Sequence, residues 1–407
     1  MTAHNPSRQI RYFTRVLLTN IAVLSIFLLI AEFAGRTFLQ HTSVDFLRYI
    51  NADLRVHLLP DMKDVFPQLS FSRIYKPDPD LAWTLRPYKQ VRRKNEDGEK
   101  WTSITSKDGF ITPNTPDLLD QQIITIGDSF LEGKRNPVPI PQVIDDHTSL
   151  PVYNLAAGGW GPYSYVAAFN KHATNRNAEV VIVFSVFNDI TDATKYKRWK
   201  TEFRHLTYED FLNADRWRHS SDNIGSTWFD NSSIVYNAIK YGITKLEQRG
   251  KRPKRAQESL QFISCEPKEY FEGGSCFSTF VDYFHAMDKL KTAVEGSGKR
   301  MVLIWIPSKG RVYFDFLNDE YKEKYLERNE KMIFDVEQII NWYANSRDIP
   351  FLDLTPIMQE NAKSGDALYF THDHHLNKNG SFLAGTSTVE FLKGNELITL
   401  KKSNPSN

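Results

Sequence analysis

The residues best suited to chemistry are a serine, an aspartate and a histidine that lie far apart in the chain. Ser129 ends the tripeptide Gly127-Asp128-Ser129, directly after a short apolar run. Asp373 and His375 stand two positions apart near the C-terminus, a spacing at which a carboxylate can orient an imidazole and stabilise its charged form. The other ring nitrogen is then able to take the proton of a serine hydroxyl. We predict these three residues as a catalytic triad that attacks a carbonyl group.

Such an attack creates an oxyanion, and three segments offer N–H groups to stabilise it. We expect the N–H of Ser129 at the start of the next helix, where the helix dipole favours negative charge. Residues 154–162 contain three glycines in four positions, so this loop can present a free backbone N–H. Asn188 ends another apolar run and is followed by Asp189, which can fix the loop. Each segment alone also fits a plain helix cap or turn.

Histidines beside the predicted triad raise the alternative of a metal site. His372, His374 and His375 flank Asp373, and imidazole and carboxylate groups are common zinc ligands. These histidines lack the i, i+4 spacing of ligands on one helix, and no distant cysteine or acidic motif joins them. We therefore predict no metal and no cofactor.

The elements that must position these residues are short apolar runs separated by helix-compatible segments. Continuous rather than alternating apolarity is typical of strands that are buried on both faces of a parallel sheet. Strands alternating with helices predict a doubly wound α/β fold, in which ligands bind at the carboxyl ends of the strands. The five predicted strands are 122–127, 152–156, 179–186, 300–307 and 350–354.

Taken together, the order Gly-Asp-Ser, glycine loop, Asn-Asp and Asp-x-His resembles the SGNH (GDSL-type) hydrolase family, over residues 120–395 apart from a long insertion. The resemblance implies a flavodoxin-like SGNH fold with a mainly parallel five-stranded sheet. It implies Ser129 as the nucleophile and Asp373 and His375 as its partners. It further implies an oxyanion hole built from the N–H groups of Ser129 and Gly159 and the amide of Asn188.

The wording of the Asp-x-His block is close to that of membrane-anchored bacterial members, some of which add or remove acetyl groups on cell-surface polysaccharide. This implies an esterase for O-acyl esters of a glycan, with an O-acyltransferase or a non-catalytic glycan-binding protein as alternatives. A membrane-bound acyl-donor protein is an expected partner. The chain departs from the family pattern at Ala156, Phe187, Glu132 and Lys134, which affects the shape of the site and leaves every triad and oxyanion group in place.

The N-terminal region predicts a membrane anchor over residues 16–35. Residues 16–31 carry no charge and Arg8, Arg11 and Arg15 precede them, so the N-terminus is expected in the cytoplasm and everything after about residue 36 is expected to be exported. The expected location is the inner (cytoplasmic) membrane, with the catalytic domain periplasmic or otherwise extracytoplasmic. A cleavable signal peptide is the main alternative, although Glu32 disfavours the cleavage site after Ala34.

Composition limits the fold class and the kinds of partner that the chain can have. The 407 residues include 41% hydrophobic residues, enough for one large α/β domain. The net charge of +2 gives no indication of nucleic-acid binding. We predict a cytoplasmic segment over 1–15, the anchor over 16–35, a stalk and small β module over 36–116, the hydrolase domain over 117–398 and a tail over 399–407.

Within this plan, turn residues around Asp97-Gly98 predict a β-hairpin in the β module. An insertion at about 191–280 interrupts the hydrolase domain and contains the basic stretch 248–255, either a solvated loop or a contact for anionic glycan or lipid. Cys265 and Cys276 lie in that insertion. They are either a disulfide, if the domain is exported, or two thiols.

Overall fold

The computed structural model describes residues 6–41, 74–113, 122–204, 275–319, 332–371 and 373–398, with the isolated positions 208, 211, 235–236, 239, 243 and 322–323. The chain divides into two compact units, residues 1–71 with 209–252 and residues 72–208 with 253–407. The basic stretch 248–255, Cys265 and His372 lie outside the described residues. The proposed disulfide and the role of the insertion therefore stay predictions, as does the domain division.

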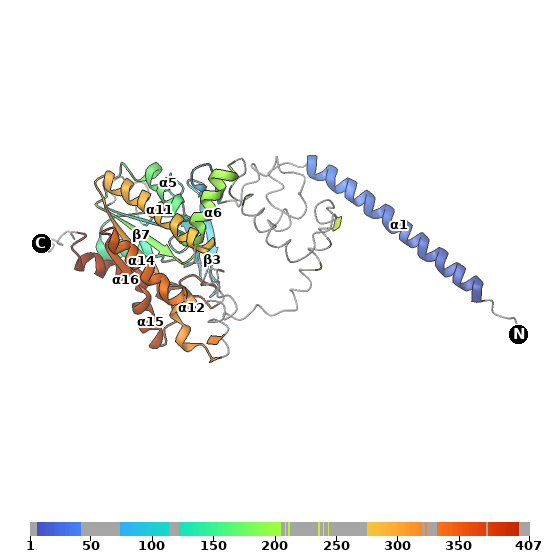
Figure 1. The fold of residues 1–407 in the computed structure, drawn as a ribbon. Helices are drawn as coiled ribbons and strands as arrows, with labels where there is room; N and C mark the ends of the chain where they lie inside the picture. The colour runs from blue at the N-terminus through green and yellow to red at the C-terminus, as the bar shows by residue number, and fades with distance from the viewer. Residues whose placement is uncertain are drawn as a thin grey trace. The chain divides into compact units, whose positions relative to one another are not determined.

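The first unit contains a long N-terminal helix, α1, which spans Pro6–His41 (Figure 1). Its segment Tyr12–Gly35 is long and apolar enough to cross a membrane. Large apolar side chains along it, such as Phe27 and Leu29, are exposed. Within the described part of the chain this is the one helix of that kind, and its length and composition suit either an anchor or a signal sequence.

The second unit is built on a parallel five-stranded sheet in the order β6-β5-β7-β8-β9. The strands are β5 (Ile123–Gly127), β6 (Val152–Ala156), β7 (Val180–Val186), β8 (Arg300–Ile306) and β9 (Phe351–Asp353). Each agrees with a predicted strand to within one residue at either end. The three central strands consist almost entirely of buried residues, as expected for a sheet covered on both faces. The doubly wound α/β prediction is confirmed.

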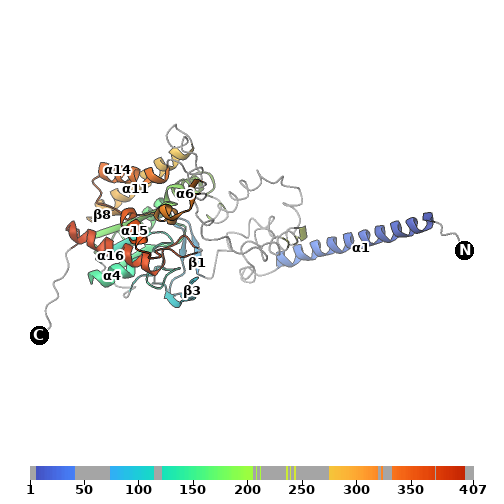
Figure 2. The same cartoon turned by 90° about the horizontal axis from the view of Figure 1, so that it is seen from below.

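Helices cover the sheet on both sides, so that strand β7 lies between α5 and α11 on one side and α15 and α16 on the other (Figure 1). Helix α4 packs against α16 (Figure 2), and α11 packs against both α5 and α6. The helices are α4 (Ile140–Thr148), α5 (Pro162–His172), α6 (Asp189–Glu202), α11 (Ser275–Gly296), α12 (Lys309–Val312), the 3-10 turn η3 (Phe314–Phe316), α14 (Met332–Ser346), α15 (Thr355–Lys363) and α16 (Lys378–Gly394).

Two antiparallel hairpins precede the sheet and form the β module. One pairs β1 (Tyr75–Asp78) with β2 (Ala82–Leu85), and the other pairs β3 (Gln90–Lys94) with β4 (Lys100–Ile104). The second hairpin turns through Gly98, whose φ of 86° suits glycine, so the predicted hairpin is confirmed. The β module belongs to the same unit as the sheet and contacts the loop after β6, where the indole N–H of Trp160 donates to the carbonyl of Trp83 at 2.8 Å.

Candidate active site

The segments singled out by the sequence meet at one edge of the sheet. Strands β5, β6 and β7 run parallel, so their carboxyl ends, at Gly127, Ala156 and Val186, lie side by side. The C-terminal block reaches the same place as a loop closed by a bridge between Tyr369 and Leu376.

At this edge the structure brings Ser129, Asp373 and His375 together. The Oγ of Ser129 lies 2.8 Å from Nε2 of His375. The Nδ1 of His375 lies 2.5 Å from Oδ1 of Asp373. Because an ionised carboxylate only accepts hydrogen bonds, Nδ1 carries the ring proton and Nε2 is free to accept the serine proton. His375 is 5% exposed, which shields this chain of hydrogen bonds from water.

Asp373 is held by more than the imidazole. Its Oδ1 also accepts the backbone N–H of His375 at 3.0 Å, and its Oδ2 pairs with Nη1 of Arg135 at 3.0 Å. Burial acts to raise the pKa of Asp373, but the hydrogen bond from His375 and the charges of His375 and Arg135 outweigh it and hold this pKa well below its usual range. The carboxylate therefore stays ionised wherever the imidazole can act as a base.

The turn that presents Ser129 differs from expectation. After β5 the chain makes one hydrogen-bonded turn, closed by the N–H of Glu132 on the carbonyl of Asp128, and helix α4 begins only at Ile140. No helix dipole points at Ser129 from α4, so that part of the prediction was wrong. The side chain of Asp128 takes over the capping role, since its Oδ1 accepts the N–H of Phe130 at 2.9 Å. The N–H of Ser129 itself has no partner among the described residues.

The glycine loop lies against this turn. A Cβ added to Gly158 would lie 3.4 Å from the Cβ of Ser129, and the Gly158 N–H donates to Oε2 of Glu132 at 2.6 Å. Gly159 adopts a φ of 76°, which favours glycine, and is exposed. Within the described residues its N–H has no hydrogen-bond partner. Two of the predicted oxyanion donors are thus unengaged.

The third predicted donor, Asn188, is engaged. Its Nδ2 donates to Oδ2 of Asp128 at 3.2 Å and to Oδ2 of Asp192 at 3.0 Å. The neighbouring Asp189 is fully buried and accepts from Tyr165 Oη at 2.7 Å and from the backbone N–H of Val186 at 3.1 Å. Asp189 therefore fixes the loop, as expected, whereas Asn188 must exchange a carboxylate partner to reach an oxyanion.

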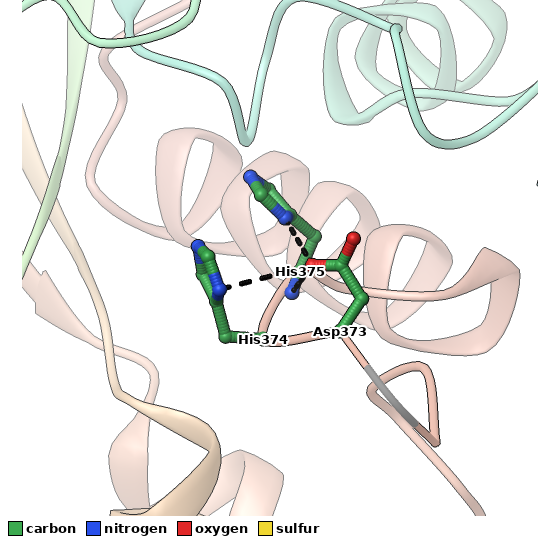
Figure 3. Close-up of side chains that lie close together, drawn as sticks. All are labelled: Asp373, His374 and His375. Atoms are coloured by element: carbon green, nitrogen blue, oxygen red, sulfur yellow. Dashed lines mark hydrogen bonds and ion pairs between the residues drawn. The ribbon is translucent and has the colours of Figure 1, made fainter. Parts of the chain in front are cut away.

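His374 is a further residue of the site, beyond the predicted triad. Figure 3 shows it beside His375 and Asp373, and the two imidazole rings lie 4.2 Å apart between centroids. Burial, with the nearby charge of His375, lowers the pKa of His374 to about 4. A neutral ring in this position adds no positive charge beside the predicted base.

The same three residues bring their nitrogen and oxygen atoms within 4.8 Å of one another, close enough to hold a metal ion. However, Nδ1 of His375 and Oδ1 of Asp373 are already joined by a short hydrogen bond. Metal ligation through these two atoms would break the bond that orients His375 toward Ser129. The geometry therefore favours serine chemistry over metal chemistry.

Sequence reasoning missed the side chains that support these groups. Glu132 was noted only as a departure from the family pattern, and Arg135 and Asp192 were not singled out. Arg135 carries no signal in the sequence, because its partner Asp373 is remote in the chain. Asp192 follows Asn188 by one helical turn of α6, and that i, i+4 spacing was the available clue.

The C-terminal part of the chain matches a known protein family. Residues 276–404 match the family described as "SGNH hydrolase-like domain, acetyltransferase AlgX". The match spans β8, β9 and the block with Asp373 and His375, whereas Ser129, Gly159 and Asn188 precede it. The predicted resemblance to SGNH hydrolases is confirmed, and with it the prediction of an ester hydrolase or acyltransferase.

Solved structures of acyl hydrolases are similar at low identity. They include a lipase/acylhydrolase from Enterococcus faecalis (13% identity, 70% of this chain and 100% of that one, TM-score 0.37). A GDSL-like lipase from Bacteroides thetaiotaomicron (10%, 67% and 88%, TM-score 0.32) and a catalytic mutant of an acetylxylan esterase from Geobacillus stearothermophilus (10%, 70% and 97%, TM-score 0.33) are also similar. No curated protein sequence matches the chain. The resemblance to SGNH hydrolases therefore rests on the family match over residues 276–404 and on the five-stranded parallel sheet.

Proposed function

We propose that this protein is a membrane-anchored serine esterase that acts on O-acetyl esters of a cell-surface glycan. One observation carries the proposal: the Oγ of Ser129 lies 2.8 Å from Nε2 of an imidazole whose other nitrogen is held by Asp373. This is the arrangement that a serine nucleophile needs. The unengaged N–H groups of Ser129 and Gly159 lie on the two loops that meet there.

In the proposed mechanism His375 takes the proton of Ser129 as the Oγ attacks the ester carbonyl. The N–H groups of Ser129 and Gly159 stabilise the oxyanion, and the amide of Asn188 joins them after it leaves a carboxylate partner. His375 then gives its proton to the leaving alcohol oxygen, which leaves an acetyl group on Ser129. Water, deprotonated by His375, attacks this acyl-enzyme, releases acetate and restores the serine hydroxyl.

A second candidate function is O-acetyl transfer, which the family match specifically favours because its description names an acetyltransferase. The chemistry is the same up to the acyl-enzyme. A sugar hydroxyl then replaces water and gives up its proton to His375 as it attacks the acetyl carbonyl. An acyl donor, which a membrane-bound partner protein would supply, and an acceptor glycan are required.

Export is the remaining part of the proposal. We infer that helix α1 anchors the chain in the inner membrane and that residues after about 36 are periplasmic, supported by its apolar segment Tyr12–Gly35 and by Arg11 and Arg15 before it. A periplasmic site would meet cell-surface glycan rather than cytoplasmic esters. The acylated carbohydrate is thus the proposed substrate class.

The test of the proposed function is esterase turnover by the purified full chain in detergent, with p-nitrophenyl acetate as substrate. Ser129→Ala should abolish turnover and labelling by a fluorophosphonate. The matched control, Ser364→Ala, changes an exposed serine whose hydroxyl bonds to the carbonyl of Asn361 and should leave both unchanged. Equal turnover in wild type and Ser129→Ala would refute the proposal that the protein is a serine esterase.

The choice between water and sugar as acceptor needs a product assay. With an acetyl donor ester and a neutral oligosaccharide, a transferase accumulates acetylated oligosaccharide in a Ser129-dependent way. An esterase releases acetate at a rate that the oligosaccharide does not change. Acetate as the sole product over a range of acceptor concentrations would contradict the transferase.

A further inference from the structure

The backbone N–H and carbonyl of Gly158 are each held by a residue outside the glycine loop. Its N–H donates to Oε2 of Glu132 at 2.6 Å, and its carbonyl accepts the indole N–H of Trp83 at 2.8 Å. The Trp83 ring also lies under the next residue, since a Cβ added to Gly159 would come within 2.7 Å of Trp83 Cζ2. The hairpin β1–β2 therefore sets where the Gly159 backbone lies.

Glu132 forms the other half of this clamp and is fully buried. The hydroxyl of Tyr75, on β1, lies 2.6 Å from each of its carboxylate oxygens. Nη2 of Arg93, on β3, lies 3.8 Å from Oε1. A buried carboxylate is stable only when such partners replace its hydration. Both hairpins of the β module thus supply groups to one carboxylate, which in turn holds the glycine loop.

The clamp decides which N–H of the glycine loop is occupied and which is left available. Gly158 lies against Ser129, with its N–H occupied by Glu132, whereas the N–H of Gly159 has no partner within the described residues. Burial, followed by the charge of Glu132, raises the pKa of the Tyr75 hydroxyl far above its usual range, so Tyr75 remains a hydrogen-bond donor at every physiological pH. The arrangement is fixed before substrate arrives, as oxyanion stabilisation requires.

We propose that Glu132, Tyr75 and Trp83 are positioning residues, through which the β module holds the Gly159 N–H where the oxyanion of the reaction forms. The proposal rests on the proposed function, because it assumes acyl transfer at Ser129. By this proposal the β module contributes to catalysis by positioning the glycine loop, and it is more than a spacer between membrane and enzyme. None of the three side chains needs to touch the substrate.

The test compares the kinetics of full-chain variants on p-nitrophenyl acetate. Glu132→Gln keeps the shape of the side chain and removes its charge, and we expect kcat to fall about 10- to 100-fold with KM within about threefold of wild type. Tyr75→Phe removes one hydroxyl and should lower kcat about 3- to 10-fold. Because Tyr75 acts through Glu132, the double variant should be no slower than Glu132→Gln alone.

Two measurements separate positioning from a loss of folding. First, rates are compared at a temperature well below the unfolding midpoint of each variant. Second, the control Tyr88→Phe, which changes an exposed tyrosine between the same hairpins, should have the kcat and KM of the wild type. Trp83→Phe removes the indole N–H and should also lower kcat with little change in KM. If Glu132→Gln unfolds, the kcat-specific losses in Tyr75→Phe and Trp83→Phe decide the question.

The outcomes also separate this inference from the proposed function. If Glu132→Gln and Tyr75→Phe have the wild-type kcat while turnover still depends on Ser129, the positioning role of the clamp is refuted and the proposed esterase function is not. Effects of Glu132 and Tyr75 that multiply in the double variant would likewise overturn it. Absence of Ser129-dependent turnover in wild type would instead remove the proposed function on which the inference rests.

Discussion

Asp373→Asn is the sharpest perturbation of the predicted triad, because it changes one atom and no volume. In the structure Oδ1 of Asp373 accepts both the Nδ1–H and the backbone N–H of His375, while Oδ2 faces the cationic Arg135. An asparagine must place its NH2 group on one of these sides. Facing Arg135, the NH2 would oppose a cation, whereas facing His375 it would oppose only the uncharged backbone N–H. The amide oxygen is therefore expected to turn to Arg135 and the NH2 to His375.

This orientation forces the wrong tautomer on the imidazole. The asparagine NH2 donates to Nδ1 of His375, the ring proton moves to Nε2, and Nε2 can no longer accept the proton of Ser129. The corresponding change in serine proteases lowers kcat about 10⁴-fold, which is about 5 kcal/mol of transition-state stabilisation. We expect a loss of about 10³- to 10⁴-fold in kcat here, with KM little changed.

The assay is steady-state hydrolysis of p-nitrophenyl acetate by the full chain. Asp366→Asn is the control, because it makes the same change on an exposed carboxylate that stands earlier in the same stretch of the chain. Circular dichroism establishes that both variants fold. The reasoning is refuted if Asp373→Asn keeps more than about a tenth of the wild-type kcat, since the predicted loss is at least about 10³-fold.

Three further predictions concern other parts of the chain. Gly159→Ala places a Cβ 2.7 Å from Trp83 at a φ of 76°, so it should lower kcat by about 10²-fold and the free energy of unfolding by about 1–2 kcal/mol or more. The control is Gly298→Ala, which has a φ of 78° and no atom within 4 Å of the added Cβ, so it should lose stability through backbone strain alone. Equal kcat in the two variants would contradict the prediction. The folded-state pKa of His374 is about 4, below the value of about 6.5 in an unfolded chain, so the unfolded state takes up the proton first and wild-type stability should fall as the pH drops from about 6.5 to about 4. His374→Asn should lose less stability over that interval, by at most about 3 kcal/mol in denaturant unfolding, and identical pH dependence of wild type and variant would argue against it. The intact chain should remain in the membrane pellet after carbonate extraction, and recovery of a shortened soluble form would indicate a cleaved signal sequence instead.

Much of the fold could be predicted from local sequence patterns. The mainly apolar runs predicted β5 to β9 because a strand that is buried on both faces is apolar at most positions. Few polar residues interrupt these strands, such as Thr125 in β5 and Ser185 in β7. The parallel arrangement then follows from the helices between the runs. The convergence of Ser129, Gly159 and Asn188 follows in turn, because the carboxyl ends of neighbouring parallel strands lie at one edge.

The supporting contacts could not be predicted in the same way. Tyr75 and Glu132 are 57 positions apart, and Trp83 and Gly158 are 75 positions apart. Nothing in the periodicity of either segment specifies the other. Likewise, the turn after β5 reads as a helix start, but the chain leaves the helical path after one turn and packs Phe130 and Leu131 into the core.

The sequence by itself determined the strands, their chemistry-bearing ends and the kind of reaction that those residue types can perform, because each depends on short-range pattern and on side-chain type. Only the tertiary structure decided that Arg135 holds Asp373, that Asn188 is engaged by two carboxylates and that the β module clamps the glycine loop. These contacts depend on how preformed elements dock, which is fixed by the shape and charge of whole surfaces and not by neighbours in the chain.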